Sequence, residues 1–174
     1  MLNESQNIEW MERGETFDWK TEKLRGGKMD KLTENRAMNF RLHPSSFILS
    51  DSSPFAPLEP DRVIYEDADT VAFYDRYPVS PGHALVVAKQ GTASLYDLPA
   101  ETQAALWRAV ATVRNLLQQR HQPDAFNIGL NDGSAAGQTI AHAHIHVIPR
   151  YTGDQADPRG GVRWIFPDKA RYWE

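Results

Sequence analysis

The sequence predicts an α+β fold: an antiparallel sheet of about five strands with one long helix packed on it. Two observations support this prediction. Short segments rich in β-branched and aromatic residues occur before and after residues 98–120. Between them, only residues 98–120 repeat apolar residues every three or four positions over a long stretch, as an amphipathic helix does. At 174 residues, the chain is long enough for one domain with an extension.

The first three strands are predicted from turn signals. Residues 62–66 (RVIYE) and 70–75 (TVAFYD) are separated by a short polar turn, Asp67-Ala68-Asp69, which is typical of a hairpin. A turn with two prolines follows and leads to a third strand over residues 83–89 (HALVVAK).

The helix is predicted from residues 98 to 120. Pro99 lies near its first turn, where a missing N–H costs little. Pro123 stops it. Its apolar face is formed by residues spaced three and four apart: Leu106, Ala109, Val110, Val113, Leu116 and Leu117.

The remaining strands follow the helix. Residues 125–130 (AFNIGL) form one, and a loop of small residues, 131–137, leads to the last, residues 139–148 (TIAHAHIHVI). Pro149 is expected to end that strand. Residues 150–174 are expected to be mostly loop, because they are rich in Gly, Asp, Arg and aromatic residues.

The first part of the chain has a different composition. Residues 1–42 carry dense charge of both signs and few apolar residues, so we expect a flexible N-terminal extension before a domain over residues 43–174 with a C-terminal tail. The alternative is a docking arm that uses Trp10, Phe17 and Trp19.

Composition also limits the partners. The formal net charge is −4 and the isoelectric point is near 5.9, which argues against general nucleic-acid binding. No apolar run reaches the roughly 18 residues of a membrane span. The first ten residues, MLNESQNIEW, lack the pattern of a secretory signal. We therefore expect a cytoplasmic protein with neither a nucleic-acid nor a membrane partner.

Three of the six histidines fall within five residues, at His142, His144 and His146. Side chains alternate along a strand, so these imidazoles are expected to share one face at a spacing of about 7 Å. The residues expected on the opposite, core-facing side are all apolar: Ala141, Ala143, Ile145 and Val147.

Three interpretations of the histidine cluster compete. It is a polar sheet face by coincidence, a metal site, or a site of nucleophilic and acid–base chemistry. The preceding loop, residues 131–139, favours the last, because its glycines can turn N–H groups toward an anion and Gln138 and Thr139 add donors. With no carboxylate close by in the sequence, this set suits a phosphate better than a metal.

Two motifs resemble the histidine-triad (HIT) family. Residues 137–150 (GQTIAHAHIHVIPR) contain the pattern His-φ-His-φ-His-φ-φ, and residues 75–87 (DRYPVSPGHALVV) resemble a second block of that family. The resemblance covers about residues 63–150. It implies a homodimer that binds nucleotides at the triad, with enzymes that hydrolyse or transfer nucleoside monophosphates.

Site roles follow from the same resemblance. His144 is expected to be the nucleophile at an α-phosphorus, His146 to contact the phosphate and leaving group, and His142 to support the hydrogen-bond network. Asp75 is expected to bind the ribose hydroxyls. The positions expected to line the phosphates are Asn131, Gln138 and Thr139. The resemblance requires no cofactor for the chemistry, although a divalent cation can accompany the substrate.

Some neighbouring residues have a second interpretation. Asp75 is also placed to cap its turn. His83 is expected to be structural. Val63, Tyr65 and Phe73 either sandwich the base or belong to the core, which is commoner for such residues in strands.

Two features depart from the family pattern or lie beyond it. Many members build a zinc site partly from Cys-Pro-Phe-Cys, where this chain has Ser53-Pro54-Phe55-Ala56, so we expect no such site and no metal. In the tail, Arg159 and Arg163 either hold distal phosphates or are ordinary surface residues.

Three functions therefore remain to be compared. The preferred one is a nucleotidyl hydrolase or transferase, with dinucleoside polyphosphates favoured over phosphoramidates by the Pro149-Arg150 ending and the long tail. The second is a nucleotide-binding sensor or scaffold without catalysis. The third is a metallohydrolase that uses the three histidines.

Overall fold

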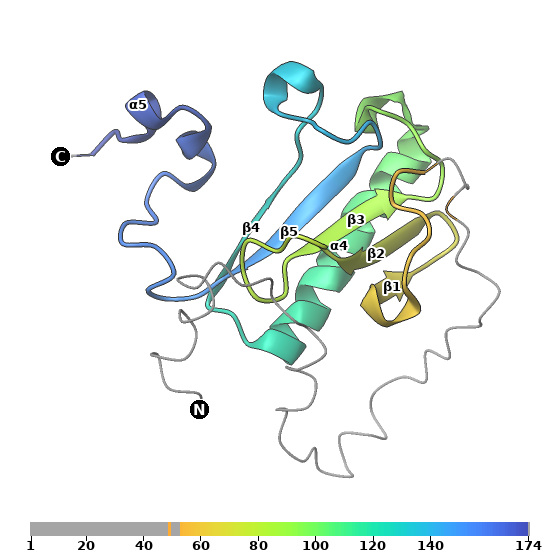
Figure 1. Cartoon of the computed structure of the whole chain (residues 1–174), viewed down its shortest axis with the longest axis horizontal. Coiled ribbons are helices and arrows are strands. Elements are labelled where there is room, and N and C mark those ends of the chain that lie inside the picture. Colours follow the sequence, from red (N-terminus) through yellow and green to blue (C-terminus); the bar gives the residue numbers. More distant parts are fainter. Residues whose placement is uncertain (1–48, 50–52, 174) are drawn as a thin grey trace, which may run out of the picture. The chain divides into compact units, whose positions relative to one another are not determined.

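A computed structural model describes Leu49 and residues 53–173. The predictions for residues 1–42, including the docking arm, lie outside the described residues. Within the described part, five strands form one sheet in the order β1-β2-β3-β5-β4, and every neighbouring pair is antiparallel (Figure 1). The bounds are β1 Val63–Glu66, β2 Thr70–Tyr74, β3 Ala84–Ala88, β4 Ala125–Gly129 and β5 His144–Arg150.

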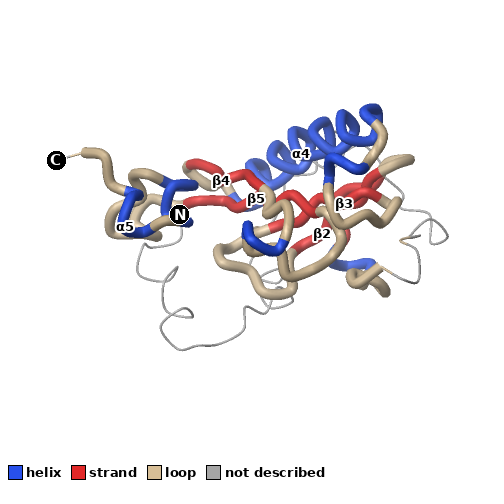
Figure 2. The backbone as a smooth tube through the Cα atoms, turned by 90° about the horizontal axis from the view of Figure 1, so that it is seen from above, coloured by secondary structure: helices blue, strands red, loops and turns tan. Residues whose placement is uncertain are grey.

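The long helix, α4, spans Ala100–His121 and covers one face of the sheet, while loops lie on the other (Figure 2). Pro99 precedes it, and Gln122 ends it in the left-handed conformation at φ 50°. The buried side of the helix meets the inner sides of the strands in one apolar core. The predicted α+β class is confirmed.

The hairpin of β1 and β2 and the third strand match the prediction to within a residue at their ends. The turn between β1 and β2 is held by Asp67, whose Oδ1 accepts from the backbone N–H of Thr70 at 2.7 Å and from that of Asp69 at 3.0 Å. This polar turn lets the two short strands pair, as residues 67–69 predicted.

The last strand differs from the prediction at both ends. β5 begins at His144 rather than residue 139, because the preceding residues bond to the loop after β3: the N–H of Ala143 donates to Thr92 O at 2.7 Å. Ala141 is therefore exposed rather than in the core. Pro149 does not end the strand. The pairing with β3 reaches only as far as Val147, which lies opposite Ala84, the first residue of β3, so no β3 residue requires a donor from Pro149.

The segment after β5 contains a 3₁₀ turn over Gly161–Ile165 and the short helix α5, Pro167–Ala170. It runs beyond the β4 side of the sheet in Figure 1. No helix in the described part of the chain is both long and apolar enough to span a bilayer.

Gly82 brings the turn before β3 close to the end of α4. Its φ is +82°, and a Cβ there would lie 2.9 Å from Cδ2 of His121 and 3.2 Å from Cγ of Pro149. The His121 imidazole cannot easily move away, because its Nε2 is hydrogen-bonded to the Tyr74 hydroxyl at 3.0 Å.

We expect Gly82→Ala to lower the free energy of unfolding by about 3 kcal/mol, from backbone strain together with overpacking. Gly153→Ala is the matched control, because its φ is +90° but nothing lies within 4 Å of the added Cβ. It should cost about 1 kcal/mol from strain alone. Urea denaturation of both variants measures the difference, and equal losses would contradict the close contact at Gly82.

Candidate active site

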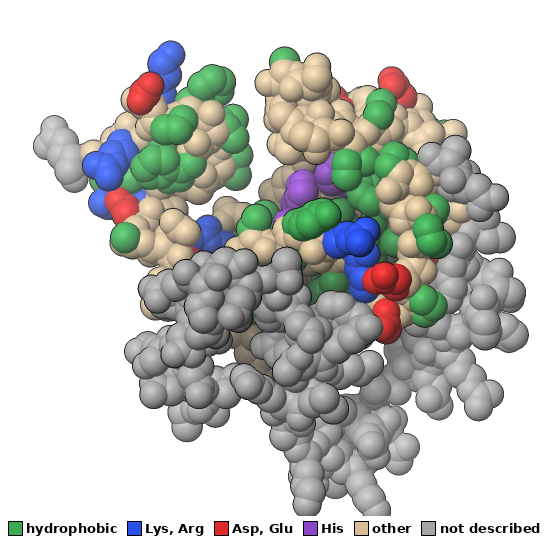
Figure 3. Space-filling view, in the orientation of Figure 1, with side chains coloured by type: hydrophobic (Ala, Val, Ile, Leu, Met, Phe, Trp, Pro, Cys, Tyr) green, Lys and Arg blue, Asp and Glu red, His purple; other side chains and the backbone are tan. Residues whose placement is uncertain are grey.

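β5 places His144 and His146 on the sheet face opposite α4. Ile145 and Val147 point into the core, so alternation turns the two histidines to the other side. Their ring centroids are 4.9 Å apart, closer than the predicted spacing of same-face positions. Histidine side chains come to the surface in the middle of the face in Figure 3, beside hydrophobic side chains.

The proton of His144 can be assigned from its surroundings. Its Nδ1 lies 2.8 Å from the carbonyl oxygen of His142, which can only accept, so Nδ1 carries the hydrogen. In the neutral imidazole, Nε2 then keeps a free lone pair. The residue is 7% exposed, and its position beside that carbonyl fixes the ring.

His142 lies before the strand and its ring is bonded on both sides. Its Nε2 donates to the carbonyl oxygen of Ala88 at 2.9 Å, which leaves Nδ1 to accept from the Ser53 hydroxyl at 3.0 Å. Burial lowers the pKa of His142, and the Ala88 carbonyl partly opposes this. The predicted supporting role fits this geometry: the side chain holds the loop, and its backbone carbonyl holds His144.

His146 is paired with His83. The N–H of Val79 donates to Nδ1 of His83 at 3.3 Å, which puts the His83 proton on Nε2, 3.0 Å from Nδ1 of His146. His146 thus accepts at Nδ1 and carries its own proton on Nε2. Burial, together with the nearby His144 and His83, lowers the pKa of His146 to about 4. Burial likewise lowers the pKa of His83.

Sequence reasoning treated His83 as structural and missed this contact. No sequence signal could have found it, because the two residues meet only through the β3–β5 pairing, where Leu85 lies opposite His146.

Asp75 caps its turn and also lies beside His83. Its Oδ1 accepts from the N–H of Tyr77 at 2.8 Å, and its Oδ2 lies 3.5 Å from Nδ1 of His83. The turn-capping interpretation is correct. It leaves Oδ2 for other partners, so a contact with ribose stays a prediction.

The loop predicted to line the phosphates is held by Gln138. Its Oε1 accepts from the N–H of Gly133 at 2.8 Å, and its Nε2 donates to the carbonyl oxygens of Ala93 at 2.7 Å and Ile140 at 3.0 Å. The amide is thus occupied in the loop, and a direct phosphate contact would require the exchange of one of these bonds. Asn131 and Thr139 are exposed, and their phosphate contacts stay predictions.

The Phe55 ring packs beside the site histidines, and the sequence analysis gave this residue no role. Its ring centroid lies 5.4 Å from that of His142, 5.5 Å from that of His144 and 5.4 Å from that of Phe73. Phe73 and Val63 are buried but lie outside the helix-facing core, and Phe73 packs against Phe55, so the choice between a core and a base-sandwich role stays a prediction. Tyr65 is half-buried and donates to Asp67 Oδ2 at 2.9 Å.

A cysteine-based zinc site does not fit this chain. Neither Ser53 nor Ala56 offers a thiolate, and the Ser53 hydroxyl is hydrogen-bonded to His142 instead.

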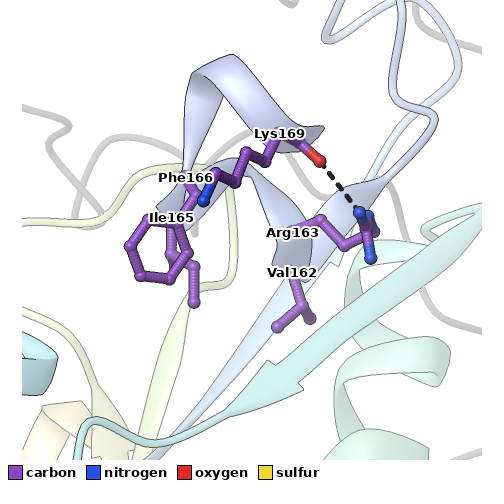
Figure 4. Close-up of a pocket in the computed structure, with 5 residues that line it drawn as sticks. All are labelled: Val162, Arg163, Ile165, Phe166 and Lys169. Carbon is purple, nitrogen blue, oxygen red and sulfur yellow. Dashed lines mark hydrogen bonds between the residues drawn. The ribbon is translucent and has the colours of Figure 1, made fainter. Parts of the chain in front are cut away.

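The two tail arginines are engaged within the tail. Arg159 pairs with Asp157 at 2.9 Å and lies 4.7 Å from the Trp173 ring centroid, while Arg163 donates to the carbonyl oxygens of Ala170 and Lys169. These contacts support the structural interpretation over the phosphate-holding one. A pocket of about 340 Å³ also lies on this segment (Figure 4), lined by Val162, Arg163, Ile165, Phe166 and Lys169. It contains none of the site histidines.

This fold and these histidines define a histidine-triad protein. The model of the HIT domain matches residues 44–153, more than half of the sequence, and the chain belongs to the HIT family.

Curated relatives include enzymes with different substrates. The chain is 36% identical over 93 residues to a bis(5'-nucleosyl)-tetraphosphatase (asymmetrical) of Schizosaccharomyces pombe, a match that covers 53% of this chain and 51% of the relative. It is 37% identical over 91 residues to the adenylylsulfatase HINT3 of Arabidopsis thaliana, which covers 52% of this chain and 46% of the relative. The chain thus spans about half the length of these two relatives.

Solved structures agree with the fold. A HIT-like protein of Bartonella henselae, described as involved in cell-cycle regulation, superposes with a TM-score of 0.55 at 34% identity, covering 60% of this chain and 82% of that one. A zinc-bound histidine-triad family protein of Mycobacterium smegmatis gives 0.53 at 37% identity, covering 57% and 72%.

Removal of the Ser53 hydroxyl should destabilise the site. In Ser53→Ala the buried Nδ1 of His142 loses its donor, and we expect a loss of about 1–3 kcal/mol in unfolding free energy. Ser134→Ala, at an exposed serine of the 131–139 loop, is the matched control and should change little. Chemical denaturation measures both. Equal stability of the two variants would show that His142 does not need this bond.

Stability should also fall in mildly acidic solution. The pKa values of His83, His121, His142 and His146 are all lowered by burial, in the case of His146 to about 4. The unfolded chain therefore binds more protons than the folded one below the ordinary histidine pKa of about 6.5. Unfolding free energy should level off about one pH unit above 6.5 and decline below that toward pH 4. A flat profile over that window in urea titrations would contradict the assignment of neutral histidines.

Proposed function

We propose that the protein is a nucleotidyl hydrolase or transferase that acts at the α-phosphate of a dinucleoside polyphosphate, or of a related nucleoside monophosphate ester or amide. The observation that carries this proposal is the 2.8 Å contact from His144 Nδ1 to the His142 carbonyl. It leaves Nε2 of His144 as a neutral nucleophile beside His146.

In the first step, Nε2 of His144 attacks the α-phosphorus. A nitrogen–phosphorus bond forms, and the bond from that phosphorus to the leaving group breaks. The neutral His146 lies on the same face, and its Nε2–H donates a hydrogen bond to the leaving oxygen or nitrogen, which departs with the bonding electron pair and takes its proton from solvent. The imidazolium charge that develops on His144 is stabilised by its hydrogen bond to the carbonyl oxygen.

In the second step, water attacks the same phosphorus and the nitrogen–phosphorus bond breaks. One proton of that water passes to solvent, and the electron pair of the nitrogen–phosphorus bond returns to Nε2 of His144. Nucleoside monophosphate leaves, His144 is again neutral, and His146 keeps its Nε2 proton throughout. The division of one displacement into two steps lowers the barrier of each.

Recognition of the nucleoside falls to Phe55 and Asp75 in this proposal. The half-buried ring of Phe55 borders His144, and the Oδ2 of Asp75 has acceptor capacity beyond its turn bond. The leaving group is proposed by analogy: the Schizosaccharomyces pombe relative is named for a dinucleoside tetraphosphate, and the Arabidopsis thaliana relative for an adenylyl sulfate. Both names refer to a substrate in which a nucleoside carries a 5'-phosphoryl group.

We also propose a homodimer, as the HIT resemblance implies. β4 forms one edge of the described sheet, and Trp107 on α4 is 46% exposed. Both leave surface for a second copy, and light scattering of the full chain tests this state.

The covalent step is tested by intact-protein mass after brief mixing with diadenosine tetraphosphate and, separately, an adenosine phosphoramidate, quenched at high pH to preserve nitrogen–phosphorus bonds. We expect a transient gain of one adenylyl group with at least one of the two compounds. His144→Ala should show no adduct and lose turnover at least about a thousandfold, while it retains nucleotide affinity in calorimetry.

His121→Gln is the control, because it removes a histidine outside the site. It should form the adduct like the wild type. Nucleotide binding without an adduct or released monophosphate from either compound would instead favour the sensor or scaffold function. Loss of turnover on chelation would favour the metallohydrolase.

A further inference from the structure

The hydrogen-bonded histidines His83 and His146 have a carboxylate, Asp75, close to both of them. One donor atom each from Asp75, His83 and His146 lies within 4.8 Å of the other two. They come from the turn after β2, the residue before β3, and β5. The sequence argument against a metal rested on the lack of a carboxylate near the histidines, but the fold brings Asp75 there from 71 positions before His146.

The backbone fixes this arrangement. The N–H of Asp75 donates to the carbonyl oxygen of His83 at 2.9 Å, so the turn before β3 closes on itself. Pairing of β3 with β5 then sets His146 beside His83, with Nδ1 and Nε2 3.0 Å apart. His83 is 3% exposed, and the side chain of Asp75 is 15% exposed. Two rigid histidines and one adjustable carboxylate thus meet near the surface.

We propose that Asp75, His83 and His146 form a binding site for a zinc-class divalent ion. Two imidazole nitrogens and a carboxylate oxygen match the three protein ligands of an open zinc site, with water in the fourth position. Nitrogens bound at 2.0–2.1 Å in tetrahedral geometry lie about 3.3 Å apart, so the histidine pair needs to open by only a few tenths of an ångström. The Asp75 oxygen must approach by rotation of its side chain.

The ion takes the place of the hydrogen between the two rings. Without metal, the hydrogen on His83 Nε2 bridges the two imidazoles; with metal, the ion bridges them, the His83 hydrogen moves to Nδ1, and the bond from the Val79 N–H is released. His144 does not belong to the group of donor atoms that lie within 4.8 Å of one another. Mg²⁺ should not bind, since it requires mostly oxygen ligands in octahedral geometry. The site is also distinct from a cysteine zinc site, because it uses neither Ser53 nor Ala56.

Calorimetry of the metal-free, nucleotide-free full chain with Zn²⁺ tests the site. We expect one ion per chain, no comparable heat with Mg²⁺, and at least a tenfold loss of Zn²⁺ affinity in both His83→Gln and Asp75→Asn. His144→Ala should bind Zn²⁺ within about twofold of the wild type. Loss of Zn²⁺ binding in His144→Ala would place the ion at the triad and overturn the proposal. Unchanged Zn²⁺ affinity in His83→Gln and Asp75→Asn, or no Zn²⁺ binding by the wild type, would also overturn it.

Melting temperatures with and without Zn²⁺ distinguish a loss of the metal site from a loss of folding. Asp75→Asn keeps an acceptor for the Tyr77 N–H, so it should fold like the wild type. Zn²⁺ should raise the wild-type melting temperature by mass action and raise that of Asp75→Asn clearly less at the same Zn²⁺ concentration. Equal upward shifts in both would overturn the site. Neither readout uses a nucleotide, so the outcome does not depend on the proposed hydrolase activity.

Discussion

The site depends on one hydrogen bond, from His144 Nδ1 to the carbonyl oxygen of His142. A carbonyl oxygen can only accept, so this single contact fixes both the ring orientation of His144 and the nitrogen that keeps a lone pair. The carbonyl is itself held in place, because the His142 ring is bonded to Ser53 on one side and to Ala88 on the other. The geometry of the nucleophile is therefore set by a histidine whose own imidazole is buried and occupied.

This arrangement explains why β5 begins where it does. A strand that started at residue 139 would put the His142 side chain on the open face with the other two, and no ring would be left to cap Ala88 at the end of β3. Instead, residues 139–143 bend toward the loop after β3, with Ala143 bonded to Thr92. These residues form no regular strand pairing. The hydrogen bonds of the His142 ring to Ala88 and of the Ala143 N–H to Thr92 take its place. Only after that point does the chain join the sheet.

Much of the fold was predictable because its signals are local. The hairpin at Asp67 and the helix between Pro99 and Pro123 are each determined by residues that are close together in the sequence. The ends of both were predicted to within two residues. The start of β5 was not, because alternation of His and Ala looks the same in a strand and in the bend before it. The pairing of His83 with His146 depends on sheet register, which no short motif encodes. The histidine cluster itself was predictable, whereas the different environments of its members were not.

Those different environments matter more than the cluster does. Burial disfavours the charged form of His146, and the nearby His144 and His83 disfavour it further, which is why the pKa of His146 falls to about 4. Neutral rings still have to divide their protons correctly. Here the backbone of His142 decides the tautomer of His144, and the N–H of Val79, acting through His83, decides that of His146. One ring therefore presents a lone pair and its neighbour presents a proton, which is the asymmetry that two-step transfer at a phosphorus atom requires.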